Sequence, residues 1–201
     1  MAVNLVKGQK IDLTKKGDKL DRIHVGLGWD PVSSGKTGGF FKKLLSSAPE
    51  IDCDASVIML NEKGVMQSNK DLIYFGNLQS GCKSVKHTGD NLTGDGDGDD
   101  EVIFVSLKSI PAHIHKLVFV VNIYDCARRN QHFGMIQNAF IRIVDQTTKK
   151  ELIRYQLSDD YANQTSLIVG EIYRRDNEWK FSATGVGTTD TGIKTIINRY
   201  K

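Results

Sequence analysis

Apolar residues in this chain recur mostly at every second position or in short runs, a pattern typical of β-strands rather than of helices. Glycine and polar clusters separate these runs, and clusters such as Gln146-Thr-Thr-Lys149 and Arg175-Asp-Asn177 have turn chemistry. The pattern predicts about ten strands. The segments that carry it are residues 3–6, 11–13, 22–29, 51–60, 72–75, 84–87, 102–107, 116–124, 140–144, 152–157, 167–173 and 179–184.

Only the C-terminal segment has helical spacing. Ile193, Ile196, Ile197 and Tyr200 fall at i, i+3, i+4 and i+7, and Asp190 is a candidate N-cap. One terminal helix after so many strands predicts a mainly β fold, a two-sheet β-sandwich.

The length of 201 residues fits a single domain over residues 1–201, long enough to bury a sizeable core. Residues 32–50, rich in Ser and Gly, interrupt the strand pattern and are predicted to form a loop insertion. The apolar patch at residues 40–45 within it is either a flap over a sandwich edge or a segment that enters a membrane surface or a partner groove.

The segment 51–60 has a clear alternation. Its odd-numbered positions share one face: Ile51, Cys53, Ala55, Val57 and Met59. The other face begins with Asp52 and Asp54, so two carboxylates project together from one edge of a predicted strand. A further acidic residue, Asp30, follows the segment 22–29, where Pro31 is expected to stop the hydrogen-bond ladder.

The most acidic stretch is Gly89-Asp-Asn-Leu-Thr-Gly-Asp-Gly-Asp-Gly-Asp-Asp-Glu101, which holds six carboxylates and four glycines. Glycine at this density gives the backbone freedom to curl. Two like charges about 7 Å apart cost roughly 2 kcal/mol at an effective dielectric of about 20. Such a loop either stays solvated or is neutralised by a cation, and dense hard oxygen ligands suit Ca²⁺.

The loop does not fit an EF-hand. Counted from Asp90, Glu101 falls at position 12, but position 6 is then Asp95 where glycine is required. Counted from Asp95, position 12 is Ser106, and the helices that flank an EF-hand are not predicted. The sequence therefore predicts an acidic loop between strands, which Asp52 and Asp54, with Asp30 as a third contributor, could complete as a calcium site.

The composition limits the kinds of partner and the cellular location that we expect for the protein. The net charge is +3, but six of the 24 Asp and Glu lie in the acidic loop, which leaves 18 against 27 Lys and Arg. No nucleic-acid-binding motif accompanies this basic surface. Three distant cysteines without a C-x-x-C pair indicate neither a zinc ribbon nor a disulfide framework. No signal peptide is evident, and the apolar run Leu117–Val121 is too short to span a bilayer, so we expect a cytoplasmic location.

Several stretches closely resemble the signatures of TerD-type tellurite-resistance proteins. The three most specific are Gly26-Leu-Gly-Trp-Asp30, Asp52-Cys-Asp-Ala-Ser56 and the stretch from His87 to Glu101. Later stretches are similar as well: Asn138-Ala-Phe-Ile-Arg142, Arg154-Tyr155 and Gly170-Glu-Ile-Tyr-Arg174 with Trp179. The resemblance covers nearly the whole chain in order, and the insertion at 32–50 makes it look closer to the TerZ branch.

The resemblance implies a calcium-binding β-sandwich with two neighbouring Ca²⁺ sites at its loop end. It implies a role in bacterial resistance to tellurite and other stresses, including phage and colicins, without an established catalytic activity. Carried over by position, the metal ligands are Asp30, Asp52, Asp54, Asp90, Asn91, Asp97, Asp99, Asp100 and Glu101. Two departures are Asp95, where Glu is more usual, and Cys53, where Leu or Phe is more usual; neither removes a ligand.

The leading hypothesis is thus a non-enzymatic, Ca²⁺-dependent interaction module. Its expected partners are other stress-response proteins of the same system, which allows association with an inner-membrane complex, and no nucleic acid. The alternatives are a metal-dependent phosphoesterase-type hydrolase and a Ca²⁺-dependent binder of membrane surfaces. For the hydrolase, the sequence has clustered carboxylates but no nucleophile elbow, no Ser/His/Asp constellation and no histidine-rich metal set.

Each of three weaker motifs has two interpretations, one functional and one purely structural. His113 and His115 are either a zinc pair on a strand face or surface residues. His87 either orients a ligand carboxylate or is an ordinary histidine at a strand end. The pairs Arg128-Arg129 and Arg174-Arg175 are either an anion site or exposed turn residues.

Overall fold

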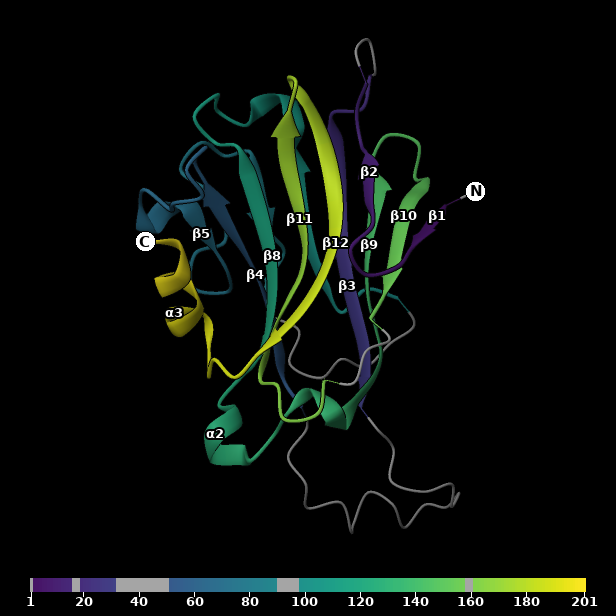
Figure 1. Cartoon of the computed structure of the whole chain (residues 1–201). Coiled ribbons are helices and arrows are strands. Elements are labelled where there is room, and N and C mark those ends of the chain that lie inside the picture. The colour runs from purple at the N-terminus through teal and green to yellow at the C-terminus, as the bar shows by residue number, and fades with distance from the viewer. Residues whose placement is uncertain (1, 16–18, 32–50, 90–97, 158–160) are drawn as a thin grey trace.

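The chain folds into two six-stranded sheets that face each other as a β-sandwich (Figure 1). This computed structural model describes residues 2–15, 19–31, 51–89, 98–157 and 161–201. The predicted fold class is confirmed.

The first sheet contains the N-terminal strand and the strands that border the acidic loop. In spatial order it consists of β1 (Val3–Leu5), β10 (Glu151–Gln156), β9 (Ile136–Asp145), β3 (Arg22–Pro31), β7 (Glu101–Ser106) and β6 (Val85–His87). The pair β1–β10 is parallel, and the other pairs of this sheet are antiparallel.

The second sheet is antiparallel among the described strands. In spatial order it consists of β2 (Lys10–Asp12), β12 (Glu178–Thr188), β11 (Ser166–Arg175), β8 (Lys116–Ile123), β4 (Cys53–Leu60) and β5 (Leu72–Ile73). Short helices and 3₁₀ turns connect the strands: η1 (Asn69–Asp71), η2 (Leu107–Ser109), α2 (Cys126–Arg129), η3 (Phe133–Met135), α3 (Ile193–Ile196) and η4 (Ile197–Tyr200).

The main core lies between the sheets, because alternate residues of facing strands point inward. The predicted inward face of β4, represented by Cys53, Val57 and Met59, belongs to this core and is fully buried. Ile51 packs against the same cluster. The alternation predicted for residues 51–60 is therefore confirmed.

A second apolar cluster covers the outward face of the second sheet. Ile58 and Val120 on β4 and β8 pack there against Ile193, Ile196 and Ile197 of the C-terminal helical segment. Since β4 and β8 are buried on both faces, the long apolar run at 116–124 is explained by its place in the sheet rather than by a membrane. Within the described residues, no helix is long and apolar enough to cross a membrane.

Two local expectations were wrong, and a third was right. Asp190 does not cap α3: Gly192 holds the N-cap position, and the Asp190 carboxylate accepts hydrogen bonds from Arg199. The C-terminus is not the only helical segment, because residues 126–129 form one helical turn that ends at Asn130 in the left-handed region. The prediction that Pro31 ends the strand is confirmed, because β3 continues through a bulge to Pro31, which is its last residue. The predicted insertion at 32–50 lies outside the described residues.

Candidate metal site

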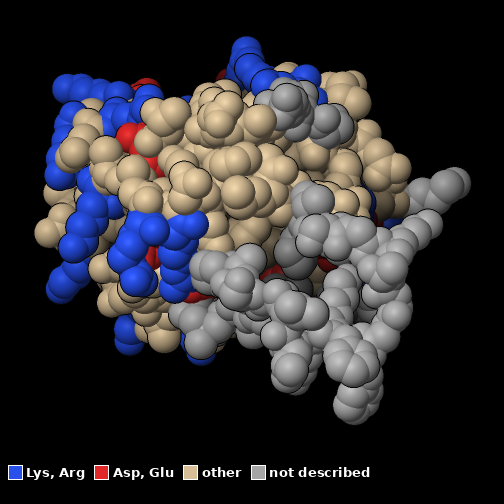
Figure 2. Space-filling view, turned by 90° about the horizontal axis from the view of Figure 1, so that it is seen from below, with Lys and Arg blue, Asp and Glu red and all other residues tan. Residues whose placement is uncertain are grey.

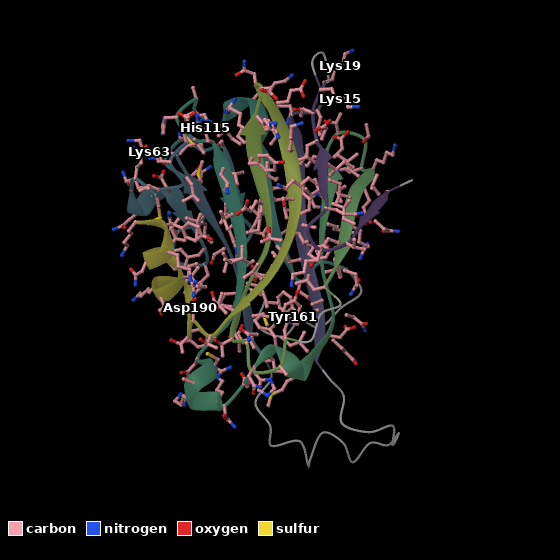
Figure 3. All side chains as sticks on the ribbon, viewed as in Figure 1. Lys15, Lys19, Lys63, His115, Tyr161 and Asp190 are labelled. Atoms are coloured by element: carbon pink, nitrogen blue, oxygen red, sulfur yellow. The ribbon has the colours of Figure 1, made fainter. Side chains whose placement is uncertain are left out.

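The predicted ligands of the first sheet gather where β3 ends and β7 begins, toward the lower end of β3 in Figure 1. Antiparallel pairing sets Leu27 opposite Glu101, so the end of the acidic loop runs beside the end of β3. Lys15 and Lys19, labelled in Figure 3, lie at the opposite end of the sandwich. The predicted ligands Asp90, Asn91 and Asp97 lie outside the described residues.

Asp99 lies on the outward face of the first sheet and is held by an arginine. Arg142 on β9 donates from Nε to Oδ1 at 2.7 Å and from Nη2 to Oδ2 at 3.0 Å. The forked geometry fixes the plane of the carboxylate. The hydrogen bond to Asp99 is also the largest cause of the raised pKa of Arg142.

Gly26 on β3 makes room for this ion pair. A Cβ atom at Gly26 would overlap the carboxyl group of Asp99. Two residues on, a Cβ at Gly28 would lie 2.5 Å from the ring of Phe140 and 2.8 Å from the carbonyl oxygen of Gly98. The two glycines of the Gly26-Leu-Gly-Trp-Asp30 motif therefore let the end of the acidic loop pack directly on the sheet.

Asp100 is attached to β3 by its backbone and its side chain. Its N–H donates to the Leu27 carbonyl at 2.8 Å, and its Oδ2 accepts from the Trp29 N–H at 2.8 Å. Burial and then the nearby charges of Asp30, Asp99 and Glu101 raise the pKa of Asp100 to about 6, although the Trp29 N–H lowers it. Four carboxylates therefore share one region, at an electrostatic cost that a bound cation would relieve.

Asp30 is the exposed member of this group. Its Oδ2 accepts a hydrogen bond from the Asn138 side chain at 2.8 Å. Asn138 adopts a left-handed backbone conformation with φ of 57° at the bulge-bearing part of β9. A hollow of about 420 Å³ next to this pair is lined by Asp30 and Asp100 on one side and by Arg154, which stacks on Phe140, on the other.

Glu101 points into the interior, where it meets His87. The two side chains are 0% and 1% exposed, and His87 Nε2 lies 2.8 Å from Glu101 Oε2 and 3.1 Å from the carbonyl oxygen of Ala55. His87 Nδ1 accepts from the Gly89 N–H at 3.0 Å, so Nε2 carries the proton and donates toward Glu101. Of the two interpretations of His87, the structure supports the one in which it orients a carboxylate.

Asp52 and Asp54 approach the same end of the molecule from the second sheet. Burial raises the pKa of the Cys53 thiol well above its ordinary value, and the charges of Asp52, Asp54, Asp100 and Glu101 raise it further. Carboxylates from both sheets thus surround one buried thiol. Asp54 itself is nearly buried on the outward face of the second sheet, where Asn122 Nδ2 donates to its Oδ2 at 3.3 Å.

The chemistry of this donor set fits a hard cation, because the contributing side-chain atoms are oxygens of carboxylates and an amide. Within the described residues, no three His, Cys, Asp or Glu side chains form a group that could hold a metal ion. A site that used the described carboxylates would therefore need further ligands.

Comparison with known proteins identifies the family. The TerD domain model matches residues 1–200. The chain belongs to the TerD family. It is 63% identical over 201 residues to stress response protein SCP2 of Bacillus subtilis (strain 168), with all of both chains covered. It is 42% identical over 183 residues to tellurium resistance protein TerZ of Serratia marcescens, which covers 91% of this chain and 89% of TerZ.

A solved structure shows the same fold. The TerD homologue SCO6318 from Streptomyces coelicolor A3(2) superposes with a TM-score of 0.63 at 18% identity, covering 85% of this chain and 92% of that one. The predicted resemblance to the TerD family is confirmed, and TerZ is among the relatives.

Sequence reasoning missed the residues that hold the TerD-family carboxylates in place. Arg142 and Asn138 appeared only as parts of a family motif, although they bind Asp99 and Asp30. Asn122, the partner of Asp54, lies in a run that reads as apolar. The signal that could have found Asn122 is a polar residue within an apolar run. Arg142 offered no such signal, because exposed arginines are common in any sequence.

The weaker motifs have structural explanations. His113 and His115 lie in the turn before β8 rather than on a strand. Arg128 and Arg175 pair with Asp125 and Asp176. Arg129 and Arg174 stack on the rings of Tyr124 and Trp179, so these four arginines are engaged with protein groups.

Proposed function

We propose that this protein is a calcium-binding, non-enzymatic member of the TerD family that serves in the stress response and in resistance to tellurite. Relatives named for stress response and for tellurium resistance support the general role. Calcium would make the acidic end rigid and so allow cytoplasmic assembly with other stress-response proteins, including membrane-associated ones.

The observation that carries the proposal is the gathering of Asp30, Asp99, Asp100 and Glu101 at one end of the first sheet, beside an acidic loop. Burial first, and then the charges of the other three carboxylates, raise the pKa of Asp100 to about 6. A divalent cation bound there would offset the repulsion, and flexible oxygen coordination of 6–8 ligands is typical of Ca²⁺. The remaining ligands are expected from Asp90, Asn91 and Asp97 in the loop.

The protein's own groups prepare these carboxylates for a cation. Arg142 fixes the orientation of Asp99, the Trp29 N–H fixes that of Asp100, and His87 fixes that of Glu101. Groups held in place before binding lose less conformational entropy when the ion arrives.

The test is calorimetry with Ca²⁺ together with thermal unfolding. At a calcium concentration of about 100 times the Kd, the folded state gains roughly 2.7 kcal/mol, which raises the melting temperature. The double variant Asp99→Asn with Asp100→Asn should abolish most of this gain. Asp176→Asn is the matched control, because that side chain is 83% exposed on a distant turn. No heat of binding and no thermal shift in the wild type would refute the proposal.

A further variant defines the extent of the site. The family resemblance adds Asp52 and Asp54 as ligands from the second sheet. If Asp54→Ala weakens calcium binding, the site spans both sheets. If the affinity is unchanged, the site is confined to the first sheet and the acidic loop.

Two assays separate the proposed role from the alternatives. A phosphodiester panel with Mg²⁺, Mn²⁺ or Ca²⁺ should show no activity, and turnover that disappears in Asp99→Ala would favour the hydrolase. Flotation with anionic liposomes should show no Ca²⁺-dependent recovery, whereas recovery would favour direct membrane binding. A calcium-dependent pull-down from cells then identifies the protein partners.

A further inference from the structure

The outward face of the second sheet carries a hollow of about 380 Å³. It lies between β4, β8 and the residues that lead into α3, close to Asp190, which Figure 3 labels. The volume is in the range of small-ligand pockets and well above the ~30 Å³ that one water occupies.

The floor of this hollow presents hydrogen-bond acceptors. Asp54 and Asn122 are paired across β4 and β8 and are 5% and 4% exposed. Only the NH₂ group of Asn122 can donate to the carboxylate of Asp54, which it does at 3.3 Å. The amide is therefore oriented with Oδ1 as a buried acceptor, and this atom has no hydrogen-bond partner among the described residues. Native proteins rarely leave such an acceptor unpaired, so this atom is available to a bound hydrogen-bond donor.

The walls of the hollow are aromatic. Tyr74, Phe75 and Tyr124 line it, and Phe75 and Tyr124 are 44% and 46% exposed. Large exposed rings around a polar floor are typical of a recognition site rather than of a core. The guanidinium of Arg129 lies over the Tyr124 ring at 5.3 Å, which shows that this ring accepts such a group.

We propose that this hollow binds the guanidinium group of an arginine side chain on a partner protein. A guanidinium carries N–H donors in one plane, which can serve Asp54 and the free Oδ1 of Asn122 together. Its flat faces can stack on Phe75 and Tyr124.

The charges around the hollow favour a cation over an anion. Asp54 is nearly buried at the floor, so water screens its charge weakly. Lys194 also lines the hollow, but its side chain is exposed and its charge is screened. Asp125 at the rim is engaged by Arg128. An ammonium group would satisfy the acceptors but would stack less well on the rings.

The direct test is a two-dimensional NMR titration with blocked amino acids as probes. Binding is detected through the backbone amide resonances of residues 74, 75 and 124. N-acetyl-arginine amide should shift these resonances in a saturable way. N-acetyl-citrulline amide, which has nearly the same shape but no charge, should bind at least about tenfold more weakly, because hydrogen bonds to charged groups are the stronger ones. N-acetyl-lysine amide should be intermediate. Equal affinity for the arginine and citrulline probes, or no saturable shift, would overturn the proposal.

Two variants locate the probe in the hollow. Asn122→Leu keeps the approximate size of the side chain but removes the acceptor, together with the amide donor to Asp54, and should weaken the arginine probe about tenfold. Phe75→Ala should weaken it about threefold through the lost ring and, since Phe75 is exposed, should leave the fold intact. Leu78→Ala is the matched control, because Leu78 is 43% exposed on the same connection but does not line the hollow. Unchanged binding in Phe75→Ala, checked to be folded by circular dichroism, would refute the site.

The inference does not rest on the first-sheet carboxylates of the calcium proposal. The Asp99→Asn with Asp100→Asn variant should bind the arginine probe as the wild type does, even where calcium binding is lost. Saturating Ca²⁺ should likewise leave the probe in place. If calcium displaced it, Asp54 would belong to the metal site and the guanidinium proposal would fall.

Discussion

The two outward faces of the sandwich hold their acidic residues in different ways. On the first sheet, Asp99 receives a forked pair of hydrogen bonds from Arg142 and rests on Gly26. On the second sheet, the neutral amide of Asn122 donates to Asp54, and the C-terminal helical segment covers the apolar part of the same face.

The two carboxylates have different neighbours and would therefore suit different ligands. Asp99 is already oriented and part of a dense group of like charges, which suits a divalent cation. Asp54 lies beside an unused acceptor and aromatic rings, which suits an organic cation. Asp30 and Asp54 look alike in the sequence, as acidic residues at strand ends, yet they lie on different sheets.

The largest effect is expected where the two sheets meet. His87→Leu removes the side chain that contacts both Glu101 on β7 and the Ala55 carbonyl on β4. Because Glu101 stays buried after its donor is lost, the free energy of unfolding should fall by about 3–4 kcal/mol. Urea denaturation measures this change in the free energy of unfolding. The control His113→Leu, at an exposed site, should stay within about 0.5 kcal/mol of the wild type, and an equal loss in both variants would contradict the prediction.

The next effect tests the contact between the acidic loop and β3. Gly26→Ala places a methyl group in the space of the Asp99 carboxyl, so Asp99 and its bond to Arg142 must shift. We expect a loss of about 2 kcal/mol in the free energy of unfolding and a weaker calcium affinity. Gly81→Ala is the control, since its nearest neighbours would lie at 3.7 Å. Full calcium affinity in Gly26→Ala would show that the position of Asp99 is unimportant for the ion.

A third variant separates two effects of Arg142 on the first sheet, the orientation of Asp99 and the positive charge beside it. Arg142→Gln removes both hydrogen bonds to Asp99, and without calcium it should lower the free energy of unfolding by about 1–2 kcal/mol. Calcium affinity, measured by calorimetry, should fall severalfold because Asp99 is no longer held in one orientation before the ion binds. Arg175→Gln, with a side chain that is 70% exposed, is the control. A rise in affinity would contradict this role and would mean that the competing positive charge of Arg142 outweighs its orienting effect on Asp99.

The smallest effect is a pH dependence. Hydrogen bonds from Arg154 and then Arg142 hold the pKa of Glu151 below its ordinary value, although partial burial raises it. Its contribution to stability, less than about 1 kcal/mol at this partly exposed site, is present above the unfolded pKa of about 4.3 and is lost as the pH falls through the folded pKa. Wild type and Glu151→Gln should therefore differ at pH 7 and converge in acid. A constant difference in melting temperature down to pH 3 would contradict this.

Much of the fold could be predicted from local pattern. Alternation in the segment 51–60 fixed which of its residues face the core, and the spacing of Ile193, Ile196 and Ile197 fixed the apolar face of the C-terminal helix. Local sequence signals gave wrong predictions where tertiary contacts determine the partner of a side chain. Asp190 is a good cap by type, but Arg199 engages its carboxylate and Gly192 begins the helix.

The sequence by itself determined the strand-rich fold, the family resemblance and the oxygen-rich chemistry of the acidic end, because each depends on residue type and short spacing. The tertiary structure alone decided which carboxylates share a neighbourhood. Strand pairing brings Arg142 to Asp99 and Asn122 to Asp54 across 43 and 68 residues of chain. It also separates the two faces of the second sheet, because a strand must send alternate side chains to opposite sides, and no spacing in the sequence shows what covers each side.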